Sequence, residues 1–284
     1  MKKLAVFSFL FLLFAFDAQA GGGWPQARKQ GYFKLGQNGI RASNIYDASG
    51  TVIPITPSTG IFTTSLYGEY GITNRFTTLL YLPFFVRSIQ NELQYNQSGL
   101  VEEGDELNSI GDTDLSFKYG LIMNKPVVVS ATLLFGLPFG NSGGGKTGVL
   151  QTGDGEFNQM LRIDVSHSFY PRPLYTSAYA GFNNRTNGFS DEWRAGLEVG
   201  YTVKQKLTFI AKLSVVQSFF NGSESVPNNG IFSNNTEYVS PEIELAYSVN
   251  QRWGFSFSAG GALAARNILA APNYGVGVFL KTGN

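Results

Sequence analysis

The chain contains no cysteine and a single histidine among its 284 residues. Without cysteine it can form no disulfide, no thiolate metal site and no cysteine-linked lipid anchor after a leader. Thiol chemistry is excluded for the same reason. The fold must therefore be stable without covalent cross-links.

Charge is also scarce. Charged residues make up 14% of the chain, and the formal net charge is +1. No basic field is available to attract nucleic acid, so we expect no nucleic-acid partner. Aromatic residues are as frequent as charged ones, at 14%, and glycine occurs 34 times. This composition is typical of a β-protein with an apolar outer surface rather than of a soluble helical enzyme.

Long apolar runs are missing except at the beginning of the chain. There Lys2 and Lys3 precede an apolar stretch over 4–16, and Ala18-Gln19-Ala20 forms a small-x-small cleavage site. This is the layout of a cleaved secretory signal, and the stretch is shorter than the roughly 20 residues of a membrane helix. We predict a signal peptide over 1–20, cleaved near Ala20 and Gly21, and one exported domain over 21–284. Its longest apolar run is 79–86, so it could cross a membrane only as a closed barrel.

The dominant pattern of the sequence is a two-residue alternation. It is clearest over 110–122, 190–203 and 236–249, where apolar residues on one face oppose polar and charged residues on the other. In a membrane barrel these faces meet lipid and lumen. A soluble antiparallel sandwich shows the same alternation, so alternation alone does not decide between them.

The connections between the strands favour the barrel. Short links at 73–74, 124–125, 171–173, 204–205 and 250–251 alternate with a second set of links that is mostly long. That set comprises 46–59, 90–108, 140–155 and 221–235, with two shorter members at 185–188 and 267–271. Short periplasmic turns and long extracellular loops are typical of bacterial outer-membrane barrels, and aromatic residues near both strand ends fit two interfacial rings.

We therefore predict an all-β, antiparallel transmembrane β-barrel of about twelve strands in the cell outer membrane, with both termini on the periplasmic side. The predicted strands are 31–45, 60–72, 75–88, 109–122, 126–139, 156–169, 174–184, 190–203, 206–220, 236–249, 252–264 and 272–282.

The polar face of these strands supplies the candidate functional residues. Charges that face a lumen tune permeation. Opposite charges could instead pair across the strands and fill a narrow, closed interior, and twelve strands give a width that allows both. The lumen-lining candidates are Arg41, Glu69, Arg87, Asp112, Asp114, Lys118, Arg162, Asp164, Glu192, Arg194, Glu198, Lys212, Glu242 and Glu244.

Three local motifs suggest other functions without supporting them. Residues 140–147 match the phosphate-binding loop G-x-x-x-x-G-K-[ST], but this loop requires a following helix and 148–155 is turn material. His167 lies between Ser166 and Ser168, yet the alternation points it outward and both serines inward, beyond the reach of a nucleophile and its base. The acidic run 102–106 is a solvated loop rather than a calcium site. We expect no catalytic residue, no metal site and no cofactor.

A family resemblance rests on residues 111–119, which read G-D-x-x-L-x-x-K-Y. Together with 66–75, 136–140 and 150–155, this segment resembles the outer-membrane family named for the MetA pathway of phenol degradation, over about 60–200. The resemblance implies a barrel with a transport function; the family name comes from operon context and does not establish phenols as the solute. Barrels of this class commonly end on an aromatic residue that the assembly machinery reads. The last aromatic residue here is Phe279 and the sequence continues to Asn284, which leaves open whether Phe279 is that signal.

The function that we expect is passive passage of small solutes, including hydrophobic or aromatic ones, through a porin-like channel. Two alternatives remain: a closed barrel with a structural or surface-interaction role and, less favoured, an outer-membrane hydrolase. The expected partners are outer-membrane lipid, the barrel assembly machinery and a small-molecule solute.

Overall fold

Strands, turns and loops make up the part of the chain that the computed structural model describes, residues 22–226 and 232–283. The predicted signal peptide lies outside these residues. The strands are β1 (Gly31–Tyr46), β2 (Val52–Gly71), β3 (Phe76–Gln90), β4 (Leu93–Gln94), β5 (Val101–Glu102), β6 (Asp105–Ser109), β7 (Thr113–Ile122), β8 (Val127–Leu137), β9 (Asn158–Ser168), β10 (Leu174–Arg185), β11 (Glu192–Val203), β12 (Leu207–Ser218), β13 (Glu237–Ser248), β14 (Trp253–Gly260), β15 (Ala264–Arg266), β16 (Ile268–Leu269) and β17 (Asn273–Thr282).

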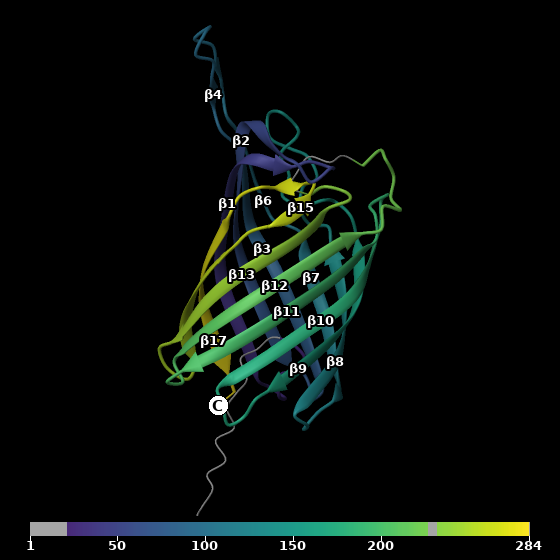
Figure 1. Cartoon of the computed structure of the whole chain (residues 1–284), viewed down its shortest axis with the longest axis vertical. Coiled ribbons are helices and arrows are strands. Elements are labelled where there is room, and N and C mark those ends of the chain that lie inside the picture. Colours follow the sequence, from purple (N-terminus) through teal and green to yellow (C-terminus); the bar gives the residue numbers. More distant parts are fainter. Residues whose placement is uncertain (1–21, 227–231, 284) are drawn as a thin grey trace, which may run out of the picture.

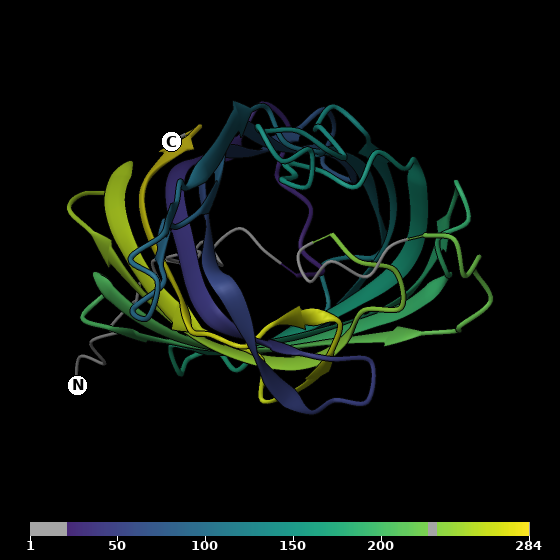
Figure 2. The same ribbon diagram turned by 90° about the horizontal axis from the view of Figure 1, so that it is seen from above.

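Twelve of these strands form a closed antiparallel barrel, as predicted. The order around the ring is β12-β11-β10-β9-β8-β7-β3-β2-β1-β17-β14-β13, and β13 pairs back with β12 to close it (Figures 1 and 2). Closure leaves the long strands without a free edge, which satisfies the backbone where no water is available. Within residues 22–226 and 232–283, no helix is long and apolar enough to span a membrane.

The two faces of the wall differ as the alternation predicts. In β9, Leu161, Ile163 and Val165 are exposed on the outside, whereas Asp164 and Ser166 between and beside them are buried. The same pattern recurs around the ring, so the outer surface is an apolar belt and the interior is polar. A soluble protein has the reverse arrangement, and this one fits a barrel wall in contact with lipid.

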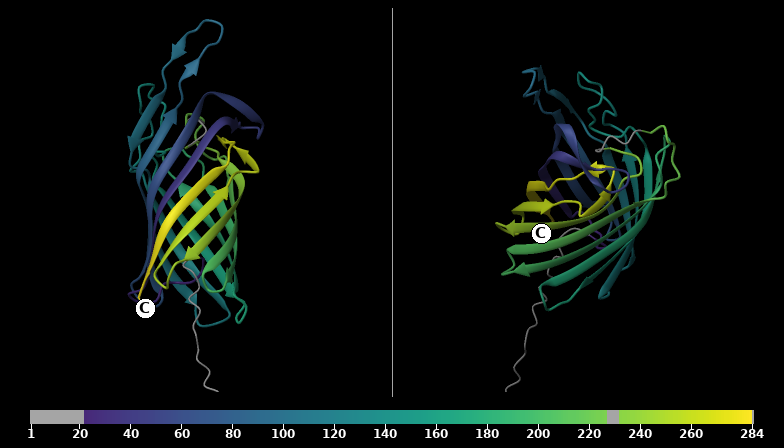
Figure 3. Two further views of the ribbon diagram at one scale, coloured as in Figure 1. Left: turned by 90° about the vertical axis from the view of Figure 1, so that its left-hand side faces the viewer. Right: turned by 45° about the horizontal axis from the view of Figure 1, so that its top comes forward.

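The first connection at the long-loop end is shorter than predicted. Residues 46–59 were expected to form a long loop, but β2 begins at Val52 and pairs with the end of β1, which leaves only 47–51 as the turn. Pro54 and Pro57 fit in this part of β2 because it has β1 on one side and no β3 partner on the other. β1 to β3 therefore rise above the rest of the barrel (Figure 3).

Two other predicted segments are subdivided. The predicted loop 90–108 contains the small hairpin β4–β5 and the short strand β6, which pairs with the end of β3. The predicted strand 252–264 stops at Gly260 as β14, and β15 replaces it beside Val239, Tyr238 and Glu237 of β13. At this level of the wall, the partner of β13 therefore changes from β14 to β15.

Candidate permeation pathway

Most of the predicted lumen residues lie on the inward face of the wall. Glu69, Lys118 and Asp164 are completely buried inside the barrel. The inward positions of the strands also carry Asp114, Arg162, Glu192, Arg194, Glu198, Lys212, Glu242 and Glu244, whereas Asp112 precedes β7 at the long-loop end.

Arg41 and Arg87 do not join this set, and here the structure differs from the prediction. In β1, Lys34 points inward, so Arg41 falls on the outer face with Leu35 and is exposed. Arg87 pairs with Glu106 of β6 at 2.6 Å, and both side chains are about half exposed. Both arginines lie in the tall part of β1 to β3, near the strand ends, where the outer face of a barrel meets water and tolerates charge.

One charged cluster lies inside the lumen, along one side of the wall, and joins β1 to β12 and β13. Lys34 Nζ donates to Glu244 Oε1 at 2.6 Å, and Lys212 Nζ contacts both Glu244 at 2.6 Å and Glu242 at 3.0 Å. β14 and β17 lie between β1 and β13, and their small inward residues leave room for this contact. A Cβ on Gly277 would come within 2.7 Å of Lys34 Cε, so glycine at this position lets the lysine pass.

A second charged cluster lies at the long-loop end, and its centre is Arg185, which is not among the predicted lumen-lining residues. Its guanidinium contacts Asp154 at 2.8 Å, Glu156 at 2.7 Å and Glu192 at 2.8 Å, and the side chain is only 6% exposed. Glu192 also forms an ion pair with Arg194, at 2.7 Å. Because Asp154 and Glu156 belong to the loop between β8 and β9, Arg185 fastens that loop to the barrel.

Further hydrogen bonds hold the same loop. Asp112 accepts from the backbone N–H of Gly140 at 2.8 Å and of Asp154 at 2.7 Å. Asp105 accepts from the backbone N–H of Lys146 and Thr147 and from the Thr147 hydroxyl, and these bonds, chiefly those from Thr147, lower the Asp105 pKa to about 2. The phosphate-loop motif is therefore a segment that packs around Asp105, and no helix follows it in the described residues.

The beginning of the described chain closes much of the short-turn end. The backbone N–H of Gly23 donates to Ser166 at 2.7 Å, and the Gly22 carbonyl accepts from Lys118 at 2.7 Å. On the other side of the segment, the backbone N–H of Gln26 donates to the Thr77 hydroxyl, and its side-chain amide donates to Glu69. In Figure 2 this purple segment lies inside the ring of strands. The sequence gives no sign of it, because 22–30 has neither periodicity nor a motif.

Aromatic side chains surround this segment. Trp24 meets Tyr175 edge to face, with centroids 5.9 Å apart, and Tyr175 donates to Glu198 at 2.7 Å. Tyr67 donates to Glu69, and its ring lies 6.3 Å from that of Tyr32. All these contacts of residues 22–26 are with β2, β3, β7, β9 and β10, so the segment covers one half of the lumen.

The other half carries small inward residues. β14, β17 and β1 present Ser256, Ser258, Gly275, Gly277 and Asn38 to the interior, and Asn38 is exposed there. The contacts of the inserted segment named above involve none of these three strands. Lys34 occupies the space beside Gly277, and the half-buried side chains of Lys212 and Glu242 belong to the same cluster.

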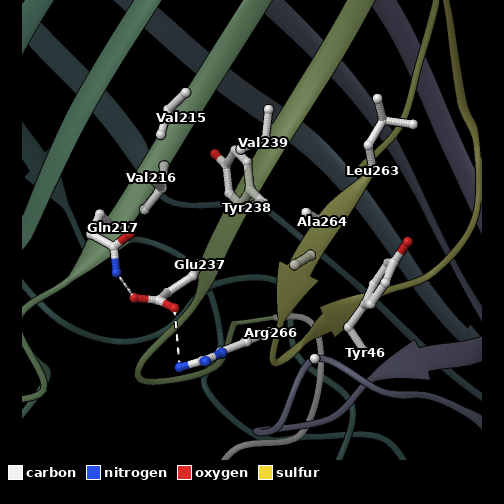
Figure 4. A pocket seen from close by; sticks show the side chains of 12 residues that line it. Tyr46, Val215, Val216, Gln217, Glu237, Tyr238, Val239, Leu263, Ala264 and Arg266 are labelled. Carbon is white, nitrogen blue, oxygen red and sulfur yellow. Dashed lines mark hydrogen bonds and ion pairs between the residues drawn. The ribbon is translucent and has the colours of Figure 1, made fainter.

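A separate pocket of about 430 Å³ lies in the wall where β15 replaces β14 (Figure 4). Tyr46, Val215, Tyr238 and Leu263 contribute to its lining. Along one side of the pocket, Glu237 accepts a hydrogen bond from the Gln217 amide and forms an ion pair with Arg266 at 3.4 Å. This pocket lies near the long-loop end of the strands and shares no residue with the lumen cluster of Lys34 and Lys212.

His167 and its neighbours lie as the alternation predicts. The His167 ring is on the outer face, where Nδ1 lies 2.7 Å from the Pro126 carbonyl and the ring meets Phe169. Ser166 points inward and shares a hydrogen bond with Ser177. Within the described residues, no group of three or more histidine, aspartate or glutamate side chains has the spacing of a metal site.

No protein-family model and no curated protein matches the chain. Solved structures match its fold. The COG4313 outer membrane channel from Pseudomonas putida F1 is 12% identical, with a TM-score of 0.62, and the match covers 94% of this chain and 100% of that one. The NanC porin is 10% identical over 88% of this chain and 100% of its own, with a TM-score of 0.53. The β domain of the Bordetella autotransporter Brka is 11% identical over 89% and 100%, with a TM-score of 0.50. At these identities the likeness concerns the fold, which is that of an outer-membrane β-barrel.

Proposed function

We propose that this protein is an outer-membrane channel through which small solutes diffuse without energy input. The observation that carries the proposal is the strip of small inward residues along β14, β17 and β1, bordered by the half-exposed side chains of Lys212 and Glu242. A solute would pass beside the inserted segment rather than through it. Wall charges at the narrowest level would then set conductance and ion preference.

The proposed solutes are small and apolar or aromatic. The resemblance to the phenol-degradation family supports this class, as does the ring of Tyr32 on β1, one of the three strands of the proposed path. Aromatic faces stack with planar solutes and tolerate different substituents. The proposal includes removal of residues 1–20 on export and insertion of the barrel by the assembly machinery.

A second candidate is a closed barrel whose loops act at the cell surface. The complete burial of Glu69, Lys118 and Asp164 favours it, because these charged groups fill part of the interior. Both candidates share the fold and the location. They differ only in whether anything crosses the lumen.

Single-channel recording on refolded protein in planar bilayers separates the two. We expect steady conductance that changes in Lys212→Gln, which removes a charge beside the proposed path. Arg162→Gln is the matched control, because Arg162 lies on the half that the inserted segment covers and should change conductance much less. The absence of conductance at any voltage would favour the closed barrel. If the Arg162 variant changed conductance more than the Lys212 variant, the path would lie on the other half. Influx of phenol and of a sugar of similar size into proteoliposomes then tests the solute class.

A further inference from the structure

Within the described residues, the turns at the short-turn end of the barrel carry positive charge only. Its turns contain Arg75, Lys125, Arg172, Lys204, Lys206 and Arg252. The segment that enters β1 adds Arg28 and Lys29 at the same end, where the Lys29 N–H donates to the Gly71 carbonyl. No aspartate or glutamate occurs in the described residues 22–30, 72–75, 123–126, 169–173, 204–206 and 249–252.

These cations are not used to stabilise the fold through ion pairs. All six turn residues are exposed, and none takes part in an ion pair within the described residues. The Arg75 guanidinium donates to one backbone carbonyl, that of Gly120, at 3.2 Å. A concentration of like charge without internal partners destabilises by repulsion unless an anionic partner offsets it.

The other end of the barrel has the opposite charge. Its loops expose acids, among them Glu92, Glu102, Glu103, Glu106 and Glu224, and the described loop residues oppose these with few cations. The chain as a whole is nearly neutral at +1. The asymmetry therefore comes from the placement of charge at two ends and not from composition.

The basic turns are spread around the whole ring rather than gathered in one patch. They connect β2 to β3, β7 to β8, β9 to β10, β11 to β12 and β13 to β14, at the lower end of the barrel in Figure 1. Exposed aromatic residues lie directly beside these turns on the outer face: Tyr119, Phe169, Tyr201, Tyr247 and Trp253. Such aromatic residues sit at the headgroup level of a bilayer. A lipid leaflet reaches every turn of such a ring, whereas a compact protein would reach only a few.

We propose that the basic turns form a binding surface for the headgroups of anionic phospholipids in the leaflet at the short-turn end. The cations bind phosphate and glycerol headgroup oxygens, and the aromatic belt sets their depth. This surface is independent of whether a solute crosses the lumen. Juxtamembrane lysine and arginine attract anionic lipid strongly enough for each residue to change the binding constant by about fivefold at low salt.

Quenching of Trp253 by brominated lipids tests the proposal directly. Trp253 is exposed beside the Asn250–Arg252 turn, and Trp24→Phe with Trp193→Phe leaves it as the sole tryptophan of the full chain. The protein is reconstituted into vesicles of phosphatidylcholine and phosphatidylglycerol, with bromine on one lipid at a time. We expect brominated phosphatidylglycerol to quench preferentially at low salt, by at least about fivefold in relative binding constant. The preference should fall toward one at high salt, where exposed charges are screened.

Two charge variants complete the test. Arg172→Gln, Lys204→Gln, Lys206→Gln and Arg252→Gln together, which include the cations of the turn beside Trp253 and of its neighbouring turn, should remove most of the preference. Removal of four cations from the other end, by Arg41→Gln, Arg87→Gln, Lys146→Gln and Arg266→Gln, should leave it intact. Retention of the folded, heat-resistant form on gels shows that each variant is a barrel. Equal quenching by both lipids, or equal loss in both variants, would overturn the proposal. Binding of labelled polyglutamate without any lipid preference would also overturn it and would indicate an acidic protein as the partner.

Discussion

At each end of the barrel a segment is fastened to the wall, and the two segments are held in different ways. At the long-loop end, Arg185 gathers Asp154, Glu156 and Glu192 and fastens the loop between β8 and β9 to the barrel, an arrangement that we call the charged closure. At the short-turn end, residues 22–26 lie inside the lumen. Two of their hydrogen bonds join neutral groups, from Gly23 to Ser166 and from Gln26 to Thr77, and two others involve Lys118 and Glu69. We call this arrangement the shape-dependent closure, because Gly22 fits where a side chain would not.

The difference determines what each closure responds to. The energy of a buried ion pair depends on the protonation of its carboxylate, and removal of one partner leaves the other charge buried and unpaired. The strength of a hydrogen bond between two neutral groups changes little between pH 5 and 8. The inserted segment depends instead on Gly22, which adopts a φ of +64° and lies against Ser166 and Ser177.

The largest effect should come from removing the centre of the charged closure. Arg185→Met leaves three buried carboxylates facing one another, and breaking a buried ion pair in this way costs about 3–5 kcal/mol. We expect the loop between β8 and β9 to detach, which hydrogen exchange of residues 138–157 in detergent micelles would detect as a loss of protection. Lys146→Met is the control. It removes an exposed pair with Glu103, and such pairs contribute about 0–1 kcal/mol. Unchanged protection in Arg185→Met would show that another contact holds the loop.

The barrel could be predicted from the sequence because the signals that specify it lie within single strands and the turns between neighbouring strands. Each strand shows its two faces by alternation, and each short turn marks a strand pair. The lumen residues Asp114, Glu198 and Glu244 followed from the same parity. Arg87 was misplaced because β3 has an extra residue against β2 between Leu82 and Phe85, and this bulge reverses the face that each later side chain takes. Arg41 was misplaced because its charge was taken as a sign of the lumen. Above the lipid the outer face also meets water, and the alternation does not show where the lipid ends.

The two closures could not be predicted, because both depend on contacts between distant segments. Arg185 falls one residue beyond the predicted strand 174–184, and its partners Asp154 and Glu156 lie 31 and 29 residues away in a loop without periodicity. Gly22 and Gly23 meet Ser166 and Ser177 only after the barrel has formed. Their role is visible in the positive φ of Gly22 and in the absence of space for a side chain.

An intermediate effect should come from the shape-dependent closure. A Cβ at Gly22 would lie 2.0 Å from Ser177 Oγ, and the positive φ strains any β-branched residue. Gly22→Val should therefore destabilise the seated segment by about 2–4 kcal/mol and release it from the wall. We expect a larger single-channel conductance than in the unaltered protein. Gly99→Val is the matched control, because Gly99 also has a positive φ, of +66°, but has nothing within 4 Å of its Cβ. If both variants conduct alike, the segment does not limit the path.

The smallest effect should be a pH response confined to the charged closure. Burial raises the Asp154 pKa to about 6 and also raises the Glu156 pKa, while Arg185 opposes and Asp112 adds to the rise at Asp154. An acid whose pKa is raised in the docked loop binds its proton more tightly there, so docking is strongest below about pH 4 and weakens as pH rises through 6. Each pKa unit corresponds to about 1.4 kcal/mol, and partial exposure of Asp154 to water reduces this, so we expect about 1–2 kcal/mol.

Hydrogen-exchange protection factors at pH 5 and 7.5 measure this response in residues 150–157, with those of 22–26 as the internal comparison. Protection of the loop should be higher at pH 5, and Asp154→Asn should reduce the difference, with the remainder due to Glu156. Asp105→Asn should leave it in place, because hydrogen bonds from Thr147 hold the Asp105 pKa near 2, outside the range. Equal responses at both ends would contradict the division into a charged and a shape-dependent closure. So would loop protection that rises with pH, because ion pairing with Arg185 would then outweigh the burial of Asp154.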